Sequence, residues 1–407
     1  MSFDITAATP VLKQYYTGQK VESLVFKSPT VALMPKDTSG SGEAYYGAIR
    51  SSITSAISHT DTVAFTDTSS SVYKRWACPW RSGYGRALVS GEVLDKTGND
   101  KGAFVRAVIS ETEGAYDGIA AQIGADIWGN GGGAIGRLDS ACNVATASIT
   151  LANPSNAIKV RVGMTLKSAS TDGTSGSVRA GSAKVIAVDL FTGVITLDVH
   201  MDDGITSPVN SDWIFADGDF GLAFQGIPAW IVKAADRAGI LGTSFNGTIR
   251  SVDPVRLAGV PYSGGGAPKK ESLIQLGMML HRMGAKTSHI VFNDLDLADV
   301  MKDITTNTRI VTETAYKNPQ IGFSAVEAAF PFGTVKLMTD PFLAQGDAYM
   351  LDMSTWKMPS IGSIPKVDFI DKLNWLRTAG ADSYEFRTLY RACTYCSNPG
   401  HNGVLTF

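Results

Sequence analysis

Apolar side chains recur at helical spacing from Thr97 to Gly133, in the longest such pattern of the chain. Asn99 and Asp100 can cap the start of a helix here, and Gly129 with Asn130 can end it. The pattern predicts one helix of roughly 30 residues, about 45 Å long. Its apolar face would span an arc of about 140° and carries Phe104, Val105, Val108, Ile109, Ala115, Tyr116, Ile119, Ile123 and Ile127.

Three glycines, Gly114, Gly118 and Gly124, lie inside this predicted helix. Each costs a helix about 0.5–1 kcal/mol relative to alanine, because glycine loses more backbone entropy on folding. Two interpretations remain open: the glycines allow another backbone to pack closely, or they let the helix bend. Neither interpretation indicates catalysis.

Short alternating segments before this helix predict a hairpin. Residues 43–50 and 72–93 have the pattern of strands, and a polar span rich in serine and threonine separates them. We therefore expect a long hairpin over residues 37–96. Residues 1–36 have the composition of an arm that packs on a partner rather than on itself, with the aromatic residues Tyr15, Tyr16 and Phe26.

The pattern changes at residues 129–139, and short strands follow until about Gly221. Turn residues separate these strands, most densely in the span 168–182. The alternation predicts a small antiparallel β domain over residues 137–221. Because helical sequence lies on both sides, we interpret this domain as an insertion into a larger one. Its predicted strands are 147–151, 158–166, 183–189, 193–199 and 212–216.

The C-terminal part mixes helical and strand patterns. Helices are expected over 269–285 and 294–303, with a buried strand at 289–293 between them. A polar span from 305 to 323 is expected to form a loop. Later strands are expected at 333–340, 348–353, 366–370 and 384–393. These elements together indicate an α+β fold class.

Composition limits the classes of protein that fit. The chain has 407 residues, 44% of them hydrophobic and 18% charged, which indicates a globular protein with two or three domains. A formal net charge of −2 provides no long-range attraction for nucleic acid or an anionic membrane. Four cysteines are too few for a disulfide framework. The start lacks a secretory-signal pattern and no apolar run reaches the ~18 residues of a membrane helix, so we expect synthesis in a reducing cytoplasm.

Two motifs resemble ligand-binding sites when they are taken alone. Gly131-x-Gly133-x-x-Gly136 matches a dinucleotide-binding pattern, but it follows a helix, leads into strands and lacks the acidic residue about 20 positions on. Cys393, Cys396 and His401 have the spacing of three zinc-knuckle ligands, yet the fourth position is a threonine. Another cysteine could complete that site only through the tertiary fold.

The remaining candidates for chemistry are weak. His200, Asp202 and Asp203 could bind a cation, or they could form a solvated turn after a strand. The nucleophile elbow and the Walker phosphate loop are both absent from the sequence. We therefore expect no enzyme activity, no cofactor and no metal.

The order of arm, long hairpin, long helix and α+β block resembles the tailed-bacteriophage major capsid proteins with the Hong Kong 97 fold. Residues 75–96 resemble the return strand of that family's extended hairpin, the E-loop, and its lead into the spine helix. Residues 101–133 resemble the spine helix and its glycine-rich exit. Residues 194–219 resemble the β insertion domain of some members, and residues 333–358 resemble the axial-domain strands.

This resemblance implies a division of the chain. The expected parts are an N-terminal arm at 1–36, the E-loop at 37–96, the spine helix of the peripheral domain at 97–136, an inserted β domain at 137–221, the rest of the peripheral domain at 222–304, the axial domain at 305–382 and a C-terminal strand returning to the core at 383–407. The chain begins almost directly with the arm. A separate scaffolding protein is therefore expected.

Basic and aromatic residues interleave in the predicted hairpin: Lys74, Arg75, Trp76, Trp80, Arg81, Tyr84 and Arg86. Such a surface could bind single-stranded nucleic acid. In a capsid it would be a strap between subunits, which we favour. The cations would then face Glu111, Glu113 and Asp117 on a neighbour's long helix, where Glu113 and Asp117 form a like-charged i,i+4 pair.

The expected function is that of a structural protein, the major shell subunit of a tailed bacteriophage. It would assemble as pentamers and hexamers into an icosahedral shell around double-stranded DNA, which it would contact non-specifically. Expected partners are further copies of the chain, a scaffolding protein, a portal and a decoration protein. The protein would be assembled in the host cytoplasm and reside in the virion, without a membrane. Alternatives are an encapsulin-like shell that stores cargo and a β-rich ligand-binding or tail protein.

Overall fold

The computed structural model describes residues 27–52, 54, 56–66, 69–92, 107–305, 310–311, 326–367, 375–378 and 380–407. The predicted arm contacts Tyr15, Tyr16 and Phe26 lie outside this described part, and so do residues 97–106 of the predicted long helix. The chain divides into two compact units. The first contains Met1–Val25, Gly85–Gly118 and Val367–Thr388, and the second contains Phe26–Tyr84, Ile119–Lys366 and Leu389–Phe407.

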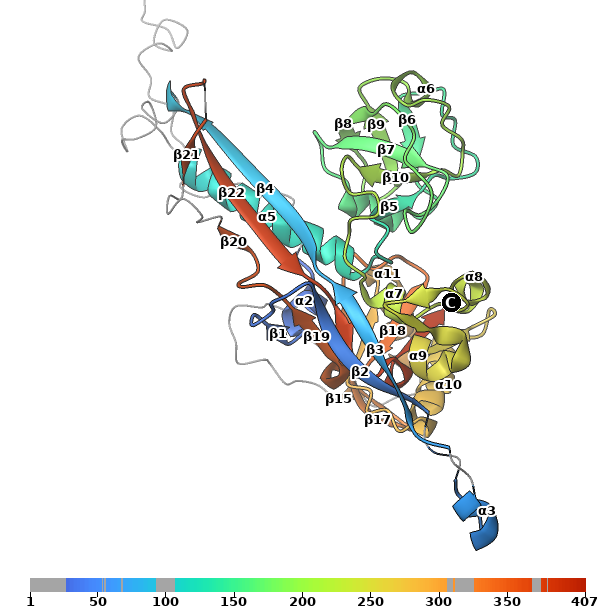
Figure 1. The fold of residues 1–407 in the computed structure, drawn as a ribbon. Coiled ribbons are helices and arrows are strands. Elements are labelled where there is room, and N and C mark those ends of the chain that lie inside the picture. The colour runs from blue at the N-terminus through green and yellow to red at the C-terminus, as the bar shows by residue number, and fades with distance from the viewer. Residues whose placement is uncertain are drawn as a thin grey trace, which may run out of the picture. The chain divides into compact units, whose positions relative to one another are not determined.

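A β-hairpin forms near the start of the second unit (Figure 1). Its strands β2 (Ala44–Ser52) and β3 (Val72–Pro79) are antiparallel, with Gly47 opposite Trp76. The connection between the two strands contains the short helix α3 (Asp61–Thr66). The side chains of a strand alternate between its two faces. In β3 one of these faces is buried.

The predicted return strand over residues 72–93 is two strands in the structure. β3 ends at Pro79, which lies opposite Ala44, the first residue of β2. The chain beyond Pro79 therefore has no residue of β2 left to pair with. β4 (Arg81–Ser90) pairs with β22 (Ser383–Ala392) instead.

The predicted long helix is present in the described part as α5 (Ala107–Ile127). It ends just before Gly129, one of the two residues predicted to end it. Ile119, Ile123 and Ile127 are buried in the main core, as the apolar face predicts. This core also contains the tryptophans Trp76, Trp230 and Trp356.

A six-stranded antiparallel sheet with its own hydrophobic core follows α5 (Figure 1). Its strand order is β5-β10-β7-β8-β9-β6. The predicted strand 158–166 is displaced: its first two residues belong to the 3₁₀ helix η1 (Pro154–Lys159), which Asn153 caps, and the strand runs from Thr165 to Ala169. The strands are β5 (Ala134–Arg137), β6 (Ser148–Thr150), β7 (Thr165–Ala169), β8 (Ala183–Val188), β9 (Val194–Leu197) and β10 (Trp213–Ala216).

A seven-stranded mixed sheet forms the other large layer, in the order β13-β24-β18-β14-β17-β16-β15. The pairs β13–β24 and β14–β17 are parallel. Helices α10 (Lys269–Arg282) and α11 (Asp294–Thr305) pack with this sheet and supply part of its core. The strands are β13 (Val260–Ser263), β14 (His289–Phe292), β15 (Ile310–Val311), β16 (Val326–Phe330), β17 (Gly333–Thr339), β18 (Asp347–Leu351) and β24 (Gly403–Thr406).

The predicted domain boundaries at 304/305 and 382/383 pass through this single sheet. Two of its strands come from before residue 304, four from between the two boundaries and one from after residue 383. Parallel strands need long crossover connections, so neighbours in the sheet lie far apart in the sequence. A division by sequence order alone therefore cannot separate these parts.

Shorter elements complete the second unit. A three-stranded sheet joins β1 (Lys36–Asp37), β19 (Trp356–Pro359) and β23 (Tyr395–Cys396), and a two-stranded sheet joins β11 (Ser244–Phe245) and β12 (Thr248–Ile249). The helices are α2 (Pro29–Leu33), α6 (Met201–Gly204), α7 (Ile227–Trp230), η2 (Ala234–Asp236), α8 (Arg237–Ile240), η3 (Arg250–Val252), α9 (Pro254–Ala258), η4 (Met353–Thr355) and η5 (Pro399–His401).

The first unit is built around the N-terminal part of β22. Phe386 lies between two aromatic rings, with its ring centroid 5.8 Å from that of Tyr116 and 5.4 Å from that of Trp375. β22 pairs with the short strands β20 (Lys366–Val367) and β21 (Leu376–Arg377). In the described parts of both units, no helix has the length and apolar character needed to cross a membrane.

Candidate functional site

The predicted hairpin contact contains one residue that the fold buries. Trp76 is 1% exposed, and its ring packs edge-to-face on Trp230 at a centroid distance of 4.8 Å. The face of β3 that carries Trp76 and Cys78 points into the main core. A side chain buried in its own subunit cannot bind a neighbour, so the assignment of Trp76 to an inter-subunit contact is corrected.

The opposite face of the hairpin is exposed and carries cations and tyrosines. The Arg75 guanidinium lies 4.5 Å from the ring centroid of Tyr46, whose outer side stays exposed. Lys74 is half-buried and lies on the same face of β3 as Trp76. Arg81, which is half-buried, and Tyr84, which is 69% exposed, lie on β4. Trp80 is half-buried, and its indole N–H donates to the carbonyl oxygen of Gly42 at 3.0 Å. This face has the composition of a protein-binding surface.

Arg86 has a partner within its own chain. Its Nε lies 2.8 Å from Oε2 of Glu385, a carboxylate with 8% of its side chain exposed. Glu385 also accepts from Arg387. Arg86 therefore forms its ion pair inside the first unit, with a carboxylate that is nearly buried. The prediction that Arg86 meets a neighbour's carboxylate is corrected, because its carboxylate partner lies in the same chain.

The acidic residues of the predicted spine-helix contact lie on α5. Glu111 and Glu113 are exposed, and Asp117 is half-buried. Glu113 and Asp117 each already have an interaction partner. The predicted acidic surface is therefore accessible at Glu111 and Glu113.

The three helix glycines differ in their surroundings. A Cβ atom on Gly114 would meet no atom within 4 Å, whereas one on Gly124 would lie 2.7 Å from Phe342 and 3.1 Å from Ser28. Gly118 is half-buried. At Gly124 two side chains, rather than another backbone, leave no room for a larger residue, and bending of the helix stays a prediction.

The glycine-rich pattern after α5 forms the junction with the six-stranded sheet. Gly131 and Gly133 have φ angles of +96° and +79°, which favour glycine. A Cβ atom on Gly133 would lie 2.2 Å from the carbonyl oxygen of Asp219. Gly221 N–H donates to the carbonyl of Gly132 at 2.8 Å, so the entry and exit of the sheet are joined here. These glycines allow the backbone to pass from α5 into the six-stranded sheet.

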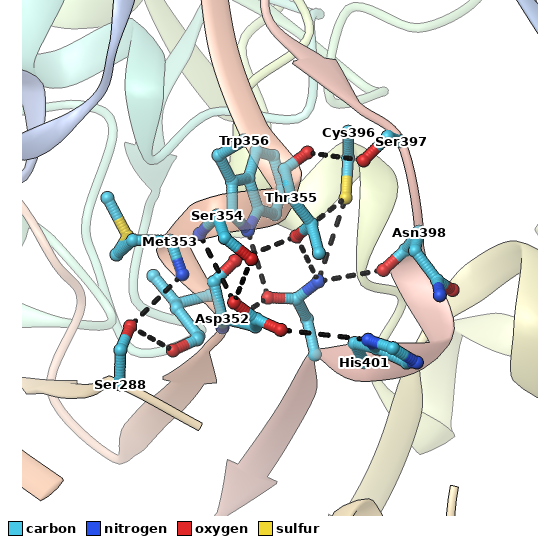
Figure 2. Close-up of polar contacts among 12 residues, drawn as sticks. Ser288, Asp352, Met353, Ser354, Thr355, Trp356, Cys396, Ser397, Asn398 and His401 are labelled. Atoms are coloured by element: carbon cyan, nitrogen blue, oxygen red, sulfur yellow. Dashed lines mark hydrogen bonds and ion pairs between the residues drawn. The ribbon is translucent and has the colours of Figure 1, made fainter. Parts of the chain in front are cut away.

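The cysteines and the histidine near the C-terminus do not converge in the way that zinc requires. Figure 2 shows the Cys396 sulfur beside Thr355, while His401 contacts Asp352, with Nδ1 3.6 Å from Oδ2. Burial raises the pKa of the Cys396 thiol to about 12. Cys396 and His401 therefore take part in a polar network through Thr355, Asn402 and Asp352.

Asn402 lies at the centre of that network. Its Oδ1 accepts from the Trp356 indole N–H and from the Asp352 backbone N–H, each at 2.9 Å. Its Nδ2 donates to Thr355 Oγ1 at 3.1 Å. The network ties η4 and η5 to the end of β18 (Figure 2). Such fully satisfied buried groups stabilise one arrangement of loops.

His200, Asp202 and Asp203 do come together, at the start of α6. All three are exposed, and His200 Nδ1 lies 3.8 Å from Asp203 Oδ2. Exposed acidic turns of this kind are common without an ion. This cluster fits the solvated turn that the sequence left as an alternative.

Sequence reasoning missed a cluster of ionisable groups near the end of α5, in which Tyr390 is buried and Asp126, Lys159 and Asp219 are half-buried. Tyr390 donates its hydroxyl to Asp126 Oδ2 at 3.1 Å. Burial raises the pKa of Asp126 to about 8 and that of Asp219 to about 6. Burial lowers the pKa of the Lys159 ammonium to about 8. The one available signal was Asp126 itself, an acid between the apolar positions Ile123 and Ile127.

Comparison with known proteins identifies a likeness in fold. No protein-family model matches the chain, and no curated protein matches it. The solved structures that match it over nearly its full length include capsid chains, among them that of a cyanophage, so the chain has the fold of a phage major capsid protein.

Two of the structures with TM-scores above one half show the extent of this likeness. The cyanophage A-1(L) capsid asymmetric unit is 12% identical, with 98% of this chain and 97% of that chain covered and a TM-score of 0.56. The capsid of the native GTA particle is 10% identical, with coverages of 100% and 99% and a TM-score of 0.52. At these identities the likeness is one of fold.

Proposed function

We propose that this chain is the major shell subunit of a tailed bacteriophage, with a fold of the Hong Kong 97 type. The observation that carries the proposal is the fold likeness to capsid chains, which extends over 98% of this chain in the cyanophage structure. A likeness of that extent is not limited to one shared domain. The absence of a catalytic constellation in the sequence agrees with a structural role.

The parts of the chain fit the roles that such a fold implies. β2 and β3 would form the E-loop, α5 the spine helix and the six-stranded sheet an inserted domain. A two-stranded hairpin alone is only marginally stable in water. Between β2 and β3, Phe65 is 86% exposed and Ile57 is 77% exposed, which favours burial against another subunit.

The hairpin cations supply a specific contact within this proposal. Arg75, Lys74 and Arg81, with Tyr84 beside them, would meet Glu111, Glu113 and Asp117 on the α5 helix of a neighbouring subunit. Charged pairs at the rim of an interface set partner orientation more than affinity. Many such contacts, each of modest strength, would make shell assembly cooperative.

The expected partners follow from the same role. Pentamers and hexamers of the chain would close into an icosahedral shell, with a scaffolding protein, a portal and a decoration protein. The net charge of −2 favours weak, non-specific contact with the packaged DNA, since affinity for DNA grows with each phosphate that a cation neutralises. The virion is the expected location.

Electron microscopy and sedimentation of the purified full chain test the proposal, with the chain expressed alone and together with a candidate scaffolding protein. Closed shells, or rings that close when scaffold is added, are expected. A chain that stays monomeric under both conditions contradicts the proposal and favours a ligand-binding role for the six-stranded sheet. Shells that contain protein cargo and no DNA would instead favour an encapsulin-like compartment.

A further inference from the structure

A cleft of about 450 Å³ opens in the second unit between η1 and the edge of the seven-stranded sheet. Its volume lies in the range of about 300–1,000 Å³ that is usual for small-molecule sites. Two hydrogen bonds join its walls: Asn153 Nδ2 donates to the Gln345 carbonyl at 3.0 Å, and the Gln345 N–H donates to Ser155 Oγ at 3.0 Å. The walls are therefore held at a defined separation.

Lysines from both walls line this cleft. Lys159 ends η1, and Lys233 precedes η2 on the opposite wall and is bonded to Asp347. Within the described part of the chain, Lys159 forms no ion pair of its own. Burial lowers the pKa of Lys159, the charge of Lys233 adds to that effect, and Asp126 and Asp340 oppose it.

A buried hydroxyl also lines the cleft. Tyr349 is 1% exposed, and its hydroxyl has no hydrogen-bond partner among the described residues. Tyr349 lines the cleft together with Asp236 and Asp347. An unsatisfied buried hydroxyl costs about 1–3 kcal/mol. A ligand that accepts a hydrogen bond here would remove that cost.

We propose that this cleft binds a tetrahedral oxyanion, phosphate or sulfate, between Lys159 and Lys233, with the Tyr349 hydroxyl donating to one of its oxygens. Oxyanion oxygens accept from ammonium and hydroxyl groups in short, charge-assisted bonds, which are stronger away from water. Arg137, Lys159 and Lys233 line the cleft against Asp236 and Asp347, and Asp347 is already bonded to Lys233. The balance of charge therefore favours an anion.

Calorimetric titration of the full chain with sodium sulfate and with inorganic phosphate tests this site. One anion per chain is expected to bind saturably. Lys159→Met should weaken binding about tenfold or more, because it removes a charge-assisted bond. Lys184→Met is the control, because Lys184 lies on β8 outside the cleft, and it should leave binding unchanged.

Tyr349→Phe separates binding from structure. Removing a hydroxyl without a partner should leave the unfolding free energy equal or higher, while anion binding becomes weaker. Absence of saturable binding to the native chain would overturn the proposal, and so would equal binding by Lys159→Met. Titration with a short oligodeoxynucleotide identifies the source of the anion. If the oligonucleotide binds and this binding depends on Lys159, the site takes a DNA backbone phosphate. If it does not, the site takes a free anion.

Discussion

Trp76 and Tyr84 lie in consecutive strands but in opposite surroundings. Trp76 packs against Trp230 in the main core, while Tyr84 is 69% exposed. Trp76→Ala should lower the unfolding free energy by about 3–5 kcal/mol, because it leaves a large cavity. Tyr84→Ala is the matched control and should change it by no more than about 0.5 kcal/mol. Urea unfolding of both variants checks this, and equal losses would contradict it.

Asp126 makes stability depend on pH. Burial raises its pKa to about 8, from an unfolded value near 3.9. Between these values the folded state holds a proton that the unfolded state has lost. The stabilisation is therefore complete below about pH 4 and is lost as pH rises through about 8.

Asp126→Asn cannot ionise, yet it keeps an oxygen for the Tyr390 hydroxyl. The unfolding free energy of this variant should fall less between about pH 5 and about pH 8 than that of the native chain. Asp189→Asn is the control, since hydrogen bonds from Thr192 and Phe191 lower the pKa of Asp189 and remove it from this window. Urea unfolding at several pH values measures the slopes, and identical slopes for Asp126→Asn and the native chain would refute the assignment.

At the scale of elements, two glycines of the same helix, α5, can be compared. Gly124→Ala should destabilise the chain by about 1–3 kcal/mol, because the new methyl group would press on the buried ring of Phe342. Gly114→Ala should stabilise it by about 0.5–1 kcal/mol, since nothing lies within 4 Å and alanine favours helix. Thermal and urea unfolding distinguish the two, and a shift of the same sign in both would contradict the packing interpretation.

The strands show how far an element can be predicted from its own residues. The alternation that indicates a strand at 72–93 is real, but the strand stops at Pro79 because β2 ends opposite it. Likewise the 3₁₀ helix that Asn153 caps extends to Lys159 and takes the first two residues of the predicted strand 158–166. A capping side chain and the length of the paired strand decide where these elements begin and end, and periodicity does not.

At the scale of the whole molecule, the proposed shell depends on charge between subunits. Arg81→Glu should prevent assembly without changing the urea unfolding of the isolated chain, because it would place like charges together. Glu111→Arg in the same chain should restore assembly. Lys286→Glu, an exposed reversal after α10, is the control. Sedimentation and microscopy report the result, and normal shells from Arg81→Glu would exclude this contact.

The candidate contact surface was predictable in part. Arg75 on β3 and Arg81 and Tyr84 on β4 remain exposed or half-exposed, as a solvated basic-aromatic pattern indicates. Trp76 and Arg86 do not fit, because burial against Trp230 and pairing with Glu385 depend on segments far away in the chain. Composition identifies which residues suit an interface, and only packing shows which of them the chain uses internally.

The sequence by itself determined several of the elements and their order along the chain. The helices α5, α10 and α11 and the strands β14, β17 and β18 lie where periodicity predicts them, since local spacing encodes which face of an element is buried. The tertiary structure alone decided that β4 pairs with β22 and that one sheet takes strands from three predicted parts. It also brought Asp126, Lys159 and Tyr390 together, because such contacts join residues whose separation along the chain leaves no local pattern.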